Sequence, residues 1–241
     1  MKRLLTTSVM MLIAVLIFAQ SNNVYWSMMV TVKMDKKLEY EKKVIAYTKT
    51  HLPGVKYRAY EIISGENTGA YVFVTGPSSY KDMDVQNVSP KGEALMKADG
   101  QALDALCVST QITYMHREEA LSMMKQDRKL KYLQIYYGEN TVGTWGSIRE
   151  ILSKVKEARE KGGSKMDIDI FRPYNGGLLN MFAAVRYFEK MEDLDIQENL
   201  GEMYDKVQGN NSYYKDNANY LSMLKSIKSE LRVLREDLSS L

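Results

Sequence analysis

The feature that most constrains this sequence is a similarity between its two halves. Shifting the chain by 111 residues aligns residues 55–86 with residues 166–197 without a gap and places Gly65 on Gly176. Few aligned residues are identical, so the alignment depends mainly on shared pattern. A period of this kind is typical of a repeated supersecondary unit. The sequence therefore predicts two copies of one unit, in residues 24–122 and 130–241.

The end of each predicted copy carries nearly the same phrase. Residues 117–122 read REEALS and residues 235–240 read REDLSS. Arg117 and Arg235 are of a type that binds acidic ligands, but their repetition within one chain favours a structural role. We predict that each forms an ion pair or cap at the end of a strand, an interaction worth little where it is exposed.

The pattern within each copy predicts a strand, a helix, two strands joined by a turn, a second helix and a final strand. Aromatic and β-branched residues mark the first strands at 25–33 and 131–138. The first helices are predicted to begin after Asp35 and after Ser147, where Glu150 completes a capping box. The second helices are predicted to extend to Leu106 and to Leu224.

One segment gives two conflicting patterns. Leu224, Ile227, Leu231, Leu234 and Leu238 are spaced three, four, three and four residues apart, which is typical of a helix. The repeat instead requires a strand at this place, like the one predicted at 110–118. Tertiary context often overrides local propensity, so we predict a strand from about Glu230 to Asp237.

The order β-α-β-β-α-β is that of the ferredoxin-like unit. Such a unit has helices on only one face of its sheet, and its bare face must be covered. We therefore predict an α+β fold in which two tandem ferredoxin-like repeats pair their sheets into an α+β barrel with helices outside. A chain arranged in this way is expected to be a monomer with an internal pseudo-dimer.

The first residues have the pattern of a secretory signal peptide. Lys2 and Arg3 precede an apolar run from Leu4 to Phe18, and Ala19 supplies a small residue before a polar stretch. The run is shorter than the roughly 20 residues that span a membrane. We predict cleavage of residues 1–19, no membrane span afterwards and export to the periplasm or the extracellular space; the alternative is an uncleaved anchor.

Charge and cysteine content exclude several classes. Lys2 and Arg3 account for two of the three net positive charges, so the predicted mature chain carries about +1 and no nucleic acid is expected as a partner. Cys107 is the only cysteine, which excludes an intrachain disulfide. We predict that it is a small core residue near the end of a helix.

The tandem β-α-β-β-α-β pattern resembles the dimeric α+β barrel superfamily, which includes antibiotic-biosynthesis-monooxygenase-like, stress-responsive barrel and NIPSNAP-like proteins. The resemblance covers almost all of the predicted mature chain, but it lies in topology and not in a catalytic motif. It implies a pocket, either inside the barrel or between a sheet and its helices. Members range from cofactor-free oxygenases and haem-dependent enzymes to proteins with no known activity, so the fold does not decide the reaction.

Histidine is too scarce to predict a metal site or a cofactor. His51 lies at a predicted helix end, where a capping role is expected, and His116 lies in the predicted fourth strand, where it is one ligand-binding candidate. The other candidates are Gln134, Tyr136 and Arg186. By the period of two in a strand, Gln134 and Tyr136 share one face, as do Ala184 and Arg186.

If those faces look into the barrel, they place polar groups in an apolar cavity, which is the usual composition of a small-molecule site. The alternative is that they fill the interface between the two copies. The sequence contains no recognisable constellation of a catalytic acid, base, nucleophile or metal ligands. We expect an exported protein that is non-catalytic or binds a small apolar or aromatic ligand in the barrel cavity; the alternative is a cofactor-free monooxygenase-like enzyme acting on an aromatic or polyketide-like substrate.

Overall fold

The computed structural model describes residues 23–83, 90–124 and 130–240, and the predicted signal peptide lies outside them. Eight antiparallel strands form a closed barrel in the order β1-β3-β2-β8-β5-β7-β6-β4. The strands are β1 Val24–Val32, β2 Arg58–Ser64, β3 Tyr71–Ser78, β4 Cys107–Arg117, β5 Tyr132–Asn140, β6 Asp167–Asn175, β7 Met181–Phe188 and β8 Leu224–Leu234.

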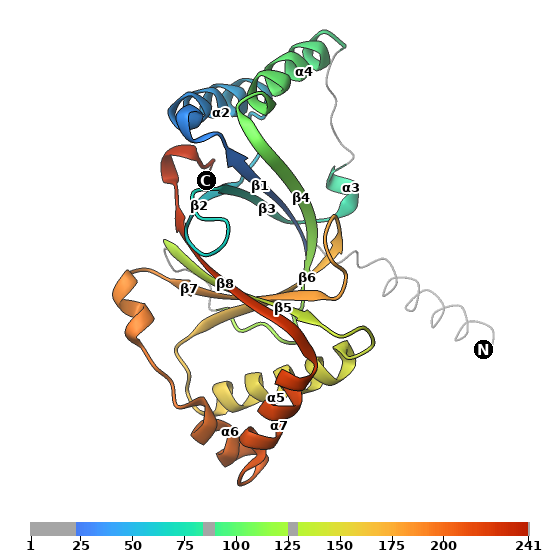
Figure 1. Cartoon of the computed structure of the whole chain (residues 1–241), viewed down its shortest axis with the longest axis vertical. Coiled ribbons are helices and arrows are strands. Elements are labelled where there is room, and N and C mark those ends of the chain that lie inside the picture. Colours follow the sequence, from blue (N-terminus) through green and yellow to red (C-terminus); the bar gives the residue numbers. More distant parts are fainter. Residues whose placement is uncertain (1–22, 84–89, 125–129, 241) are drawn as a thin grey trace, which may run out of the picture.

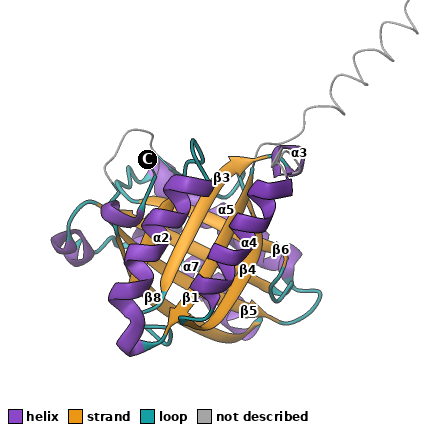
Figure 2. Cartoon of the chain, turned by 90° about the horizontal axis from the view of Figure 1, so that it is seen from above, coloured by secondary structure: helices purple, strands orange, loops and turns teal. Residues whose placement is uncertain are grey.

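The helices cover the barrel on two opposite sides (Figure 1). On one side lie α2 Lys37–His51 and α4 Pro90–Asp104, and on the other α5 Trp145–Lys161, α6 Leu200–Gln208 and α7 Ser212–Ser222. Shorter elements are α3 Tyr80–Met83 and the 3-10 turns η1 Met34–Lys36, η2 Met191–Asp195 and η3 Glu236–Leu238. Seen from above, the strands under α2 and α4 cross those on the far side at a steep angle (Figure 2).

Closure of the barrel depends on two strand pairs that join the halves of the chain. β2 pairs with β8, with Tyr60 opposite Leu234, and β4 pairs with β6, with Arg117 opposite Phe171. Closure leaves no strand edge unpaired, so the backbone amides and carbonyls around the barrel find partners on both sides. The fold is therefore an α+β barrel with one set of helices outside each half.

The C-terminal segment is a strand, as the repeat predicts and against its helical spacing. β8 begins at Leu224 instead of Glu230, and α7 correspondingly ends at Ser222, so the prediction of a helix through Leu224 is wrong. The reason is tertiary: β8 pairs with β5 from Asn140↔Leu224 to Tyr132↔Val233 and with β2 on its other side. Two ladders of hydrogen bonds outweigh the local preference for a helix.

The predicted caps of the first helices are also wrong. α5 begins at Trp145 because the Thr144 carbonyl already accepts the Ile148 amide at 3.1 Å, so Ser147 lies inside the helix. Asp35 lies in the 3-10 turn η1, closed by a bond from the Lys36 amide to the Lys33 carbonyl. No described helix is both long and apolar enough to cross a membrane.

Both repeated arginines lie at strand ends in ion pairs, which confirms that prediction. Arg117 contacts Asp169 on β6 at 2.8 Å, and Arg235 contacts Glu61 on β2 at 2.9 Å and also Glu41. Asp169 and Glu61 each lie in the half of the chain opposite to their arginine. The two ion pairs therefore join the halves at the β4–β6 pair and at the β2–β8 pair. Arg117 and Arg235 therefore fasten the two places where the halves meet.

Candidate functional site

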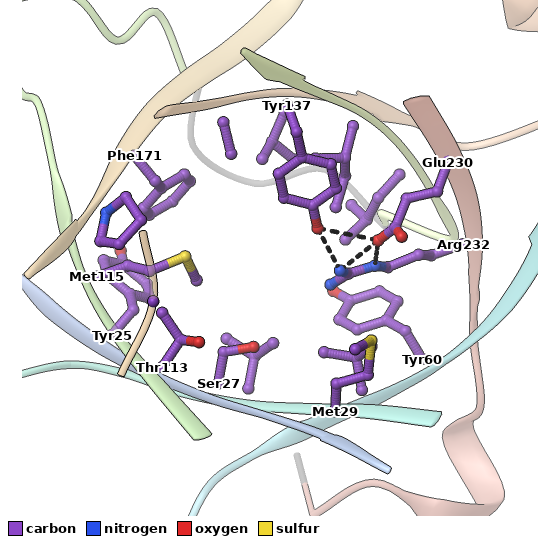
Figure 3. A pocket seen from close by; sticks show the side chains of 18 of the residues that line it. Tyr25, Ser27, Met29, Tyr60, Thr113, Met115, Tyr137, Phe171, Glu230 and Arg232 are labelled. Atoms are coloured by element: carbon purple, nitrogen blue, oxygen red, sulfur yellow. Dashed lines mark hydrogen bonds and ion pairs between the residues drawn. The ribbon is translucent and has the colours of Figure 1, made fainter. Parts of the chain in front are cut away.

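The barrel encloses a cavity of about 420 Å³ (Figure 3). Its wall is made by alternate residues of the strands, because successive side chains of a strand point to opposite faces. Most of the wall is apolar or aromatic. These lining residues include Tyr25, Met29, Tyr60, Val72, Val74, Met115, Leu133, Ile135, Phe171, Ala183, Val185 and Tyr187.

One wall of the cavity carries a compact polar group. Tyr137 on β5 donates its hydroxyl hydrogen to Glu230 Oε1 at 3.0 Å and accepts a hydrogen bond from Arg232 Nη2 at 2.7 Å. Arg232 Nε donates to the same Glu230 oxygen at 2.6 Å. Glu230 and Arg232, two residues apart on β8, are 6% and 7% exposed. The three side chains lie side by side, opposite Tyr25, Met115 and Phe171 (Figure 3).

This Tyr137–Glu230–Arg232 group combines a neutral phenol, a carboxylate and a guanidinium. Burial raises the pKa of Tyr137 well above its ordinary value, and Glu230 raises it further while Arg232 opposes this. Burial disfavours the charged form of Arg232, but Tyr137 and Glu230 outweigh it, and its pKa is raised. Tyr137 therefore stays protonated at neutral pH, and the charges of Glu230 and Arg232 cancel.

A second polar group closes one end of the barrel. Asp169, which is 2% exposed, accepts hydrogen bonds from Tyr187 at 3.0 Å and from Arg117 at 2.8 Å. The opposite end carries an exposed ion pair between Lys228 and Glu66, at 2.6 Å. Because both members of that pair also line the cavity, the cavity reaches solvent at this end.

A second cavity, of about 410 Å³, lies outside the barrel, between the sheet and helices α5, α6 and α7. We call it the outer pocket. Its walls are mainly apolar, with Ile151 and Leu152 of α5, Ala184 of β7 and Tyr220 of α7 among them. The other half of the chain has a smaller cavity of about 210 Å³ beneath α2 and α4.

The structure places two of the four predicted ligand residues in the wall of the outer pocket, a third bonded to one of them, and none in the barrel. Tyr136 and Arg186 line the outer pocket, and Gln134 accepts a hydrogen bond from Arg186 at 3.0 Å. The idea that these faces look into the barrel is therefore wrong. The reason is that tyrosines occupy both faces of β5, Tyr137 toward the cavity and Tyr136 toward the helices, so the period of two does not tell inside from outside.

His116 lies apart from the other three candidates. It is on β4, with its Nε2 3.4 Å from the Tyr80 hydroxyl and its ring 4.8 Å from that of Tyr174. It lines neither cavity. His51 ends α2, as predicted, but its ring contacts Asp99 of α4 at 2.8 Å. Whether any of the four candidates binds a ligand stays a prediction.

Sequence reasoning missed Tyr137, Glu230 and Arg232. A signal was present, because opposite charges two residues apart share one face of a strand, and Leu231 and Val233 between and beside them are apolar. The strand predicted from Glu230 to Asp237 already contains both charged residues, but the sequence alone does not show which face of that strand the barrel encloses. Cys107 packs against the core as the first residue of β4, with its thiol donating to the Leu103 carbonyl at 3.3 Å.

No protein-family model and no curated protein matches this sequence. Solved structures do match the fold. An anthrone oxidase-like protein has a TM-score of 0.54 at 9% identity, over 90% of this chain and 93% of that one. A "putative monooxygenase" from Lactobacillus acidophilus NCFM has a TM-score of 0.50 at 8% identity, over 88% and 94%. A mutant chlorite dismutase from Candidatus Nitrospira defluvii has 0.55 at 9%, over 89% and 94%.

These similarities concern the fold alone, an α+β barrel, and leave the activity open. The superfamily that the sequence pattern resembles includes haem-dependent enzymes, and haem most often needs a histidine ligand. The chain has only two histidines, and neither lines the barrel cavity or the outer pocket. Among the described residues no cluster of three or more His, Cys, Asp or Glu side chains is placed to hold a metal ion. The residues of these cavities therefore do not fit a histidine-ligated haem.

Proposed function

We propose that the protein binds a small, uncharged, largely aromatic molecule inside the barrel. The observation that carries this proposal is the Tyr137–Glu230–Arg232 group, set in a cavity of about 420 Å³ with apolar and aromatic walls. A few polar groups in an otherwise apolar cavity are the usual composition of a small-molecule site. Because the charges of Glu230 and Arg232 cancel, a neutral ligand enters without leaving an unpaired charge.

The orientation of the ligand follows from the one carboxylate oxygen of the Tyr137–Glu230–Arg232 group that accepts no hydrogen bond within the group. Glu230 Oε1 accepts the hydrogen bonds of both Tyr137 and Arg232, whereas Oε2 accepts none from any described residue. A ligand that carries a hydroxyl or N–H group can donate to Oε2 while its rings contact Phe171 and Met115 on the opposite wall. We therefore expect a planar phenol or a similar donor, and not a hydrocarbon.

Two neighbouring residues of β7 allow a matched test. Ala183 lines the barrel cavity and Ala184 lines the outer pocket. Titration calorimetry with 1-naphthol should show binding to the wild type and to Ala184→Leu, and at least tenfold weaker binding to Ala183→Leu, whose larger side chain projects into the cavity and obstructs the ligand. Equal binding by wild type and Ala183→Leu, with each variant folded by circular dichroism, would overturn the proposal.

A second candidate function is cofactor-free oxygenation, which the position of Glu230 favours. A carboxylate that faces an apolar cavity is placed to take a proton from an activated methylene of a bound substrate. The carbanion then reduces O₂: one oxygen atom becomes the product carbonyl, the other leaves as water, and the methylene carbon supplies the electrons. Anthrone is a suitable probe, because its oxidation to anthraquinone consumes one O₂. Oxygen uptake by wild type and not by Ala183→Leu supports this function; no uptake leaves binding alone.

We also propose that the two halves of the barrel are tandem repeats within one chain. Each half contributes four neighbouring strands, in the orders β4-β1-β3-β2 and β8-β5-β7-β6. Gly65 and Gly176, aligned in the sequence, both have positive φ (114° and 79°), and a Cβ on either one would clash with the backbone of a neighbouring strand. A monomer with an internal pseudo-dimer follows, and light scattering after gel filtration tests it: a stable dimer contradicts it.

Export is proposed from the first residues alone. Lys2, Arg3 and the apolar run to Phe18 support it. N-terminal sequencing of the protein from the exported fraction should begin at Gln20, whereas a protein that keeps Met1 and stays with the membrane is anchored.

A further inference from the structure

We infer that the outer pocket is a second ligand site, specific for an amphipathic monocarboxylate. The pocket wall has two chemically different parts. One part is apolar and includes Ile151, Leu152, Ala184 and Tyr220. Arg159, in the last turn of α5, and Arg186, near the end of β7, form the charged part of the wall. Such a pocket suits an apolar body with an anionic head.

Arg186 is the cation that lacks a counter-ion. Its Nη1 donates to the neutral amide oxygen of Gln134 at 3.0 Å, and its guanidinium lies 4.8 Å from the centre of the Phe188 ring. Its Nε is buried without a hydrogen-bond partner. No carboxylate of the described residues lies within 4.0 Å of it. A half-buried guanidinium with one buried N–H that has no acceptor is costly unless a carboxylate pairs with it.

Arg159 adds a second incompletely bonded donor. Its Nε is buried and makes no hydrogen bond, because the nearest carboxylate oxygen, Glu198 Oε2, is 3.6 Å away. Burial lowers the pKa of Arg159, and the nearby charge of Arg186 lowers it further, against the attraction of Glu198. An arriving carboxylate therefore meets two guanidinium groups, of which only that of Arg159 has an acidic partner.

The remaining charges at the pocket are already matched. Lys154 contacts Asp216 at 3.2 Å, and Tyr204 donates to the same carboxylate at 2.6 Å. Lys156 donates to the Ala120 carbonyl at 3.1 Å and lies 3.8 Å from Glu160. The unmatched charge is thus about one positive unit, which suits a single carboxylate. Arginine binds carboxylates through two parallel N–H donors, which favours this head group over a neutral alcohol.

Decanoate and decanol separate a carboxylate site from a merely apolar one, because they differ only in the head group. Trp145 begins α5 and packs against two buried clusters that include the lining residues Ile151, Ile168 and Ile170, so its fluorescence reports on this pocket. The chain has one other tryptophan, Trp26, which lies at the cavity under α2 and α4. In a full-length Trp26→Phe background, we expect decanoate to bind at least tenfold more tightly than decanol.

Arg186→Met should remove that preference, lowering decanoate affinity at least tenfold and leaving decanol affinity unchanged. Arg149→Met is the matched control, because Arg149 lies on α5 with an exposed side chain, and it should leave both affinities unchanged. If Arg186→Met does not fold, Ala184→Leu decides: it should abolish binding of both probes, whereas Ala183→Leu should not.

Two results would overturn the inference. One is equal affinity of the wild type for decanoate and decanol. The other is loss of decanoate binding in Ala183→Leu but not in Ala184→Leu, which would place the probe in the barrel. Neither result bears on whether 1-naphthol binds inside the barrel, so the two proposals stand or fall separately.

Discussion

Two arginines, the buried Arg232 and the half-buried Arg186, lie on opposite faces of one sheet, and their hydrogen-bond partners differ in charge. Arg232 faces the barrel and bonds to Glu230 and Tyr137. Arg186 faces the helices and bonds to Gln134, an amide without charge. Both positions remove a guanidinium from water, but only the first supplies a carboxylate. The comparison teaches that the two arginine sites are chemically distinct: the guanidinium in the barrel wall is paired with a carboxylate, and that of Arg186 at the outer pocket is not.

The largest loss of stability is expected from removing Glu230, the carboxylate that pairs with Arg232. Glu230→Leu leaves the guanidinium of Arg232 buried and unpaired, and we expect a loss of about 3–5 kcal/mol in the free energy of unfolding, measured by urea denaturation. The double variant Glu230→Leu/Arg232→Met should recover most of that loss, because it removes both charges. A single variant as stable as the wild type would show that the pair does not hold the barrel wall.

High pH should weaken the same wall. Burial, reinforced by a neighbouring carboxylate, raises the pKa of Tyr137 and of Tyr187 above the ordinary value of 10. A group whose pKa is raised in the folded state contributes stability that is complete below its unfolded pKa and is lost as pH rises through the folded value. We therefore expect the free energy of unfolding to fall above about pH 10. Tyr137→Phe should reduce this fall; an identical pH profile would contradict the assignment.

Adjacent tyrosines on β5 give a smaller and well-controlled comparison. Tyr137→Phe removes a hydroxyl that makes two buried hydrogen bonds, and we expect a loss of about 1–2 kcal/mol. Tyr136→Phe removes a hydroxyl on the outer face, where the side chain is 38% exposed, and should change stability by less than about 0.5 kcal/mol. Equal losses in urea denaturation would mean that the barrel group is no more strongly bonded than the outer face.

The smallest effect is expected at Arg186. Without ligand, Arg186→Met replaces an unmatched, half-buried cation with an apolar side chain of similar length, which should leave stability unchanged or raise it by about 1 kcal/mol. Thermal denaturation measures this directly. A loss of several kcal/mol would show that Arg186 is a structural residue, which would contradict the expected difference from Arg232.

Much of the fold was predictable from the sequence, because pattern and repetition reinforce each other. The aromatic and β-branched runs that begin each half predict β1 and β5 within about two residues. The buried face of α5, with Ile148 and Ile151, follows from helical spacing. β8 is predicted as a strand only by the repeat, since its leucine spacing favours a helix. The sequence pattern did not predict helix α6. Its N-cap is Asn199, whose side chain accepts the Glu202 amide at 3.2 Å.

The candidate site was less predictable, for a physical reason. Period two groups Gln134 with Tyr136 and separates both from Tyr137, but it does not say which group faces the barrel. That depends on strand register and on the helices, which are long-range properties. The sequence therefore brought together residues that are close in space, Gln134 and Arg186, and assigned them to the wrong cavity.

Native mass spectrometry of the full-length protein, purified without harsh washing, tests the central claim most directly. If the barrel holds a small neutral molecule, the wild type and Ala184→Leu should each be a monomer with one discrete added mass that disappears on denaturation, and Ala183→Leu should lack it. If the added mass is absent from the wild type, even after incubation with 1-naphthol, or persists in Ala183→Leu, the barrel interior is not a ligand site.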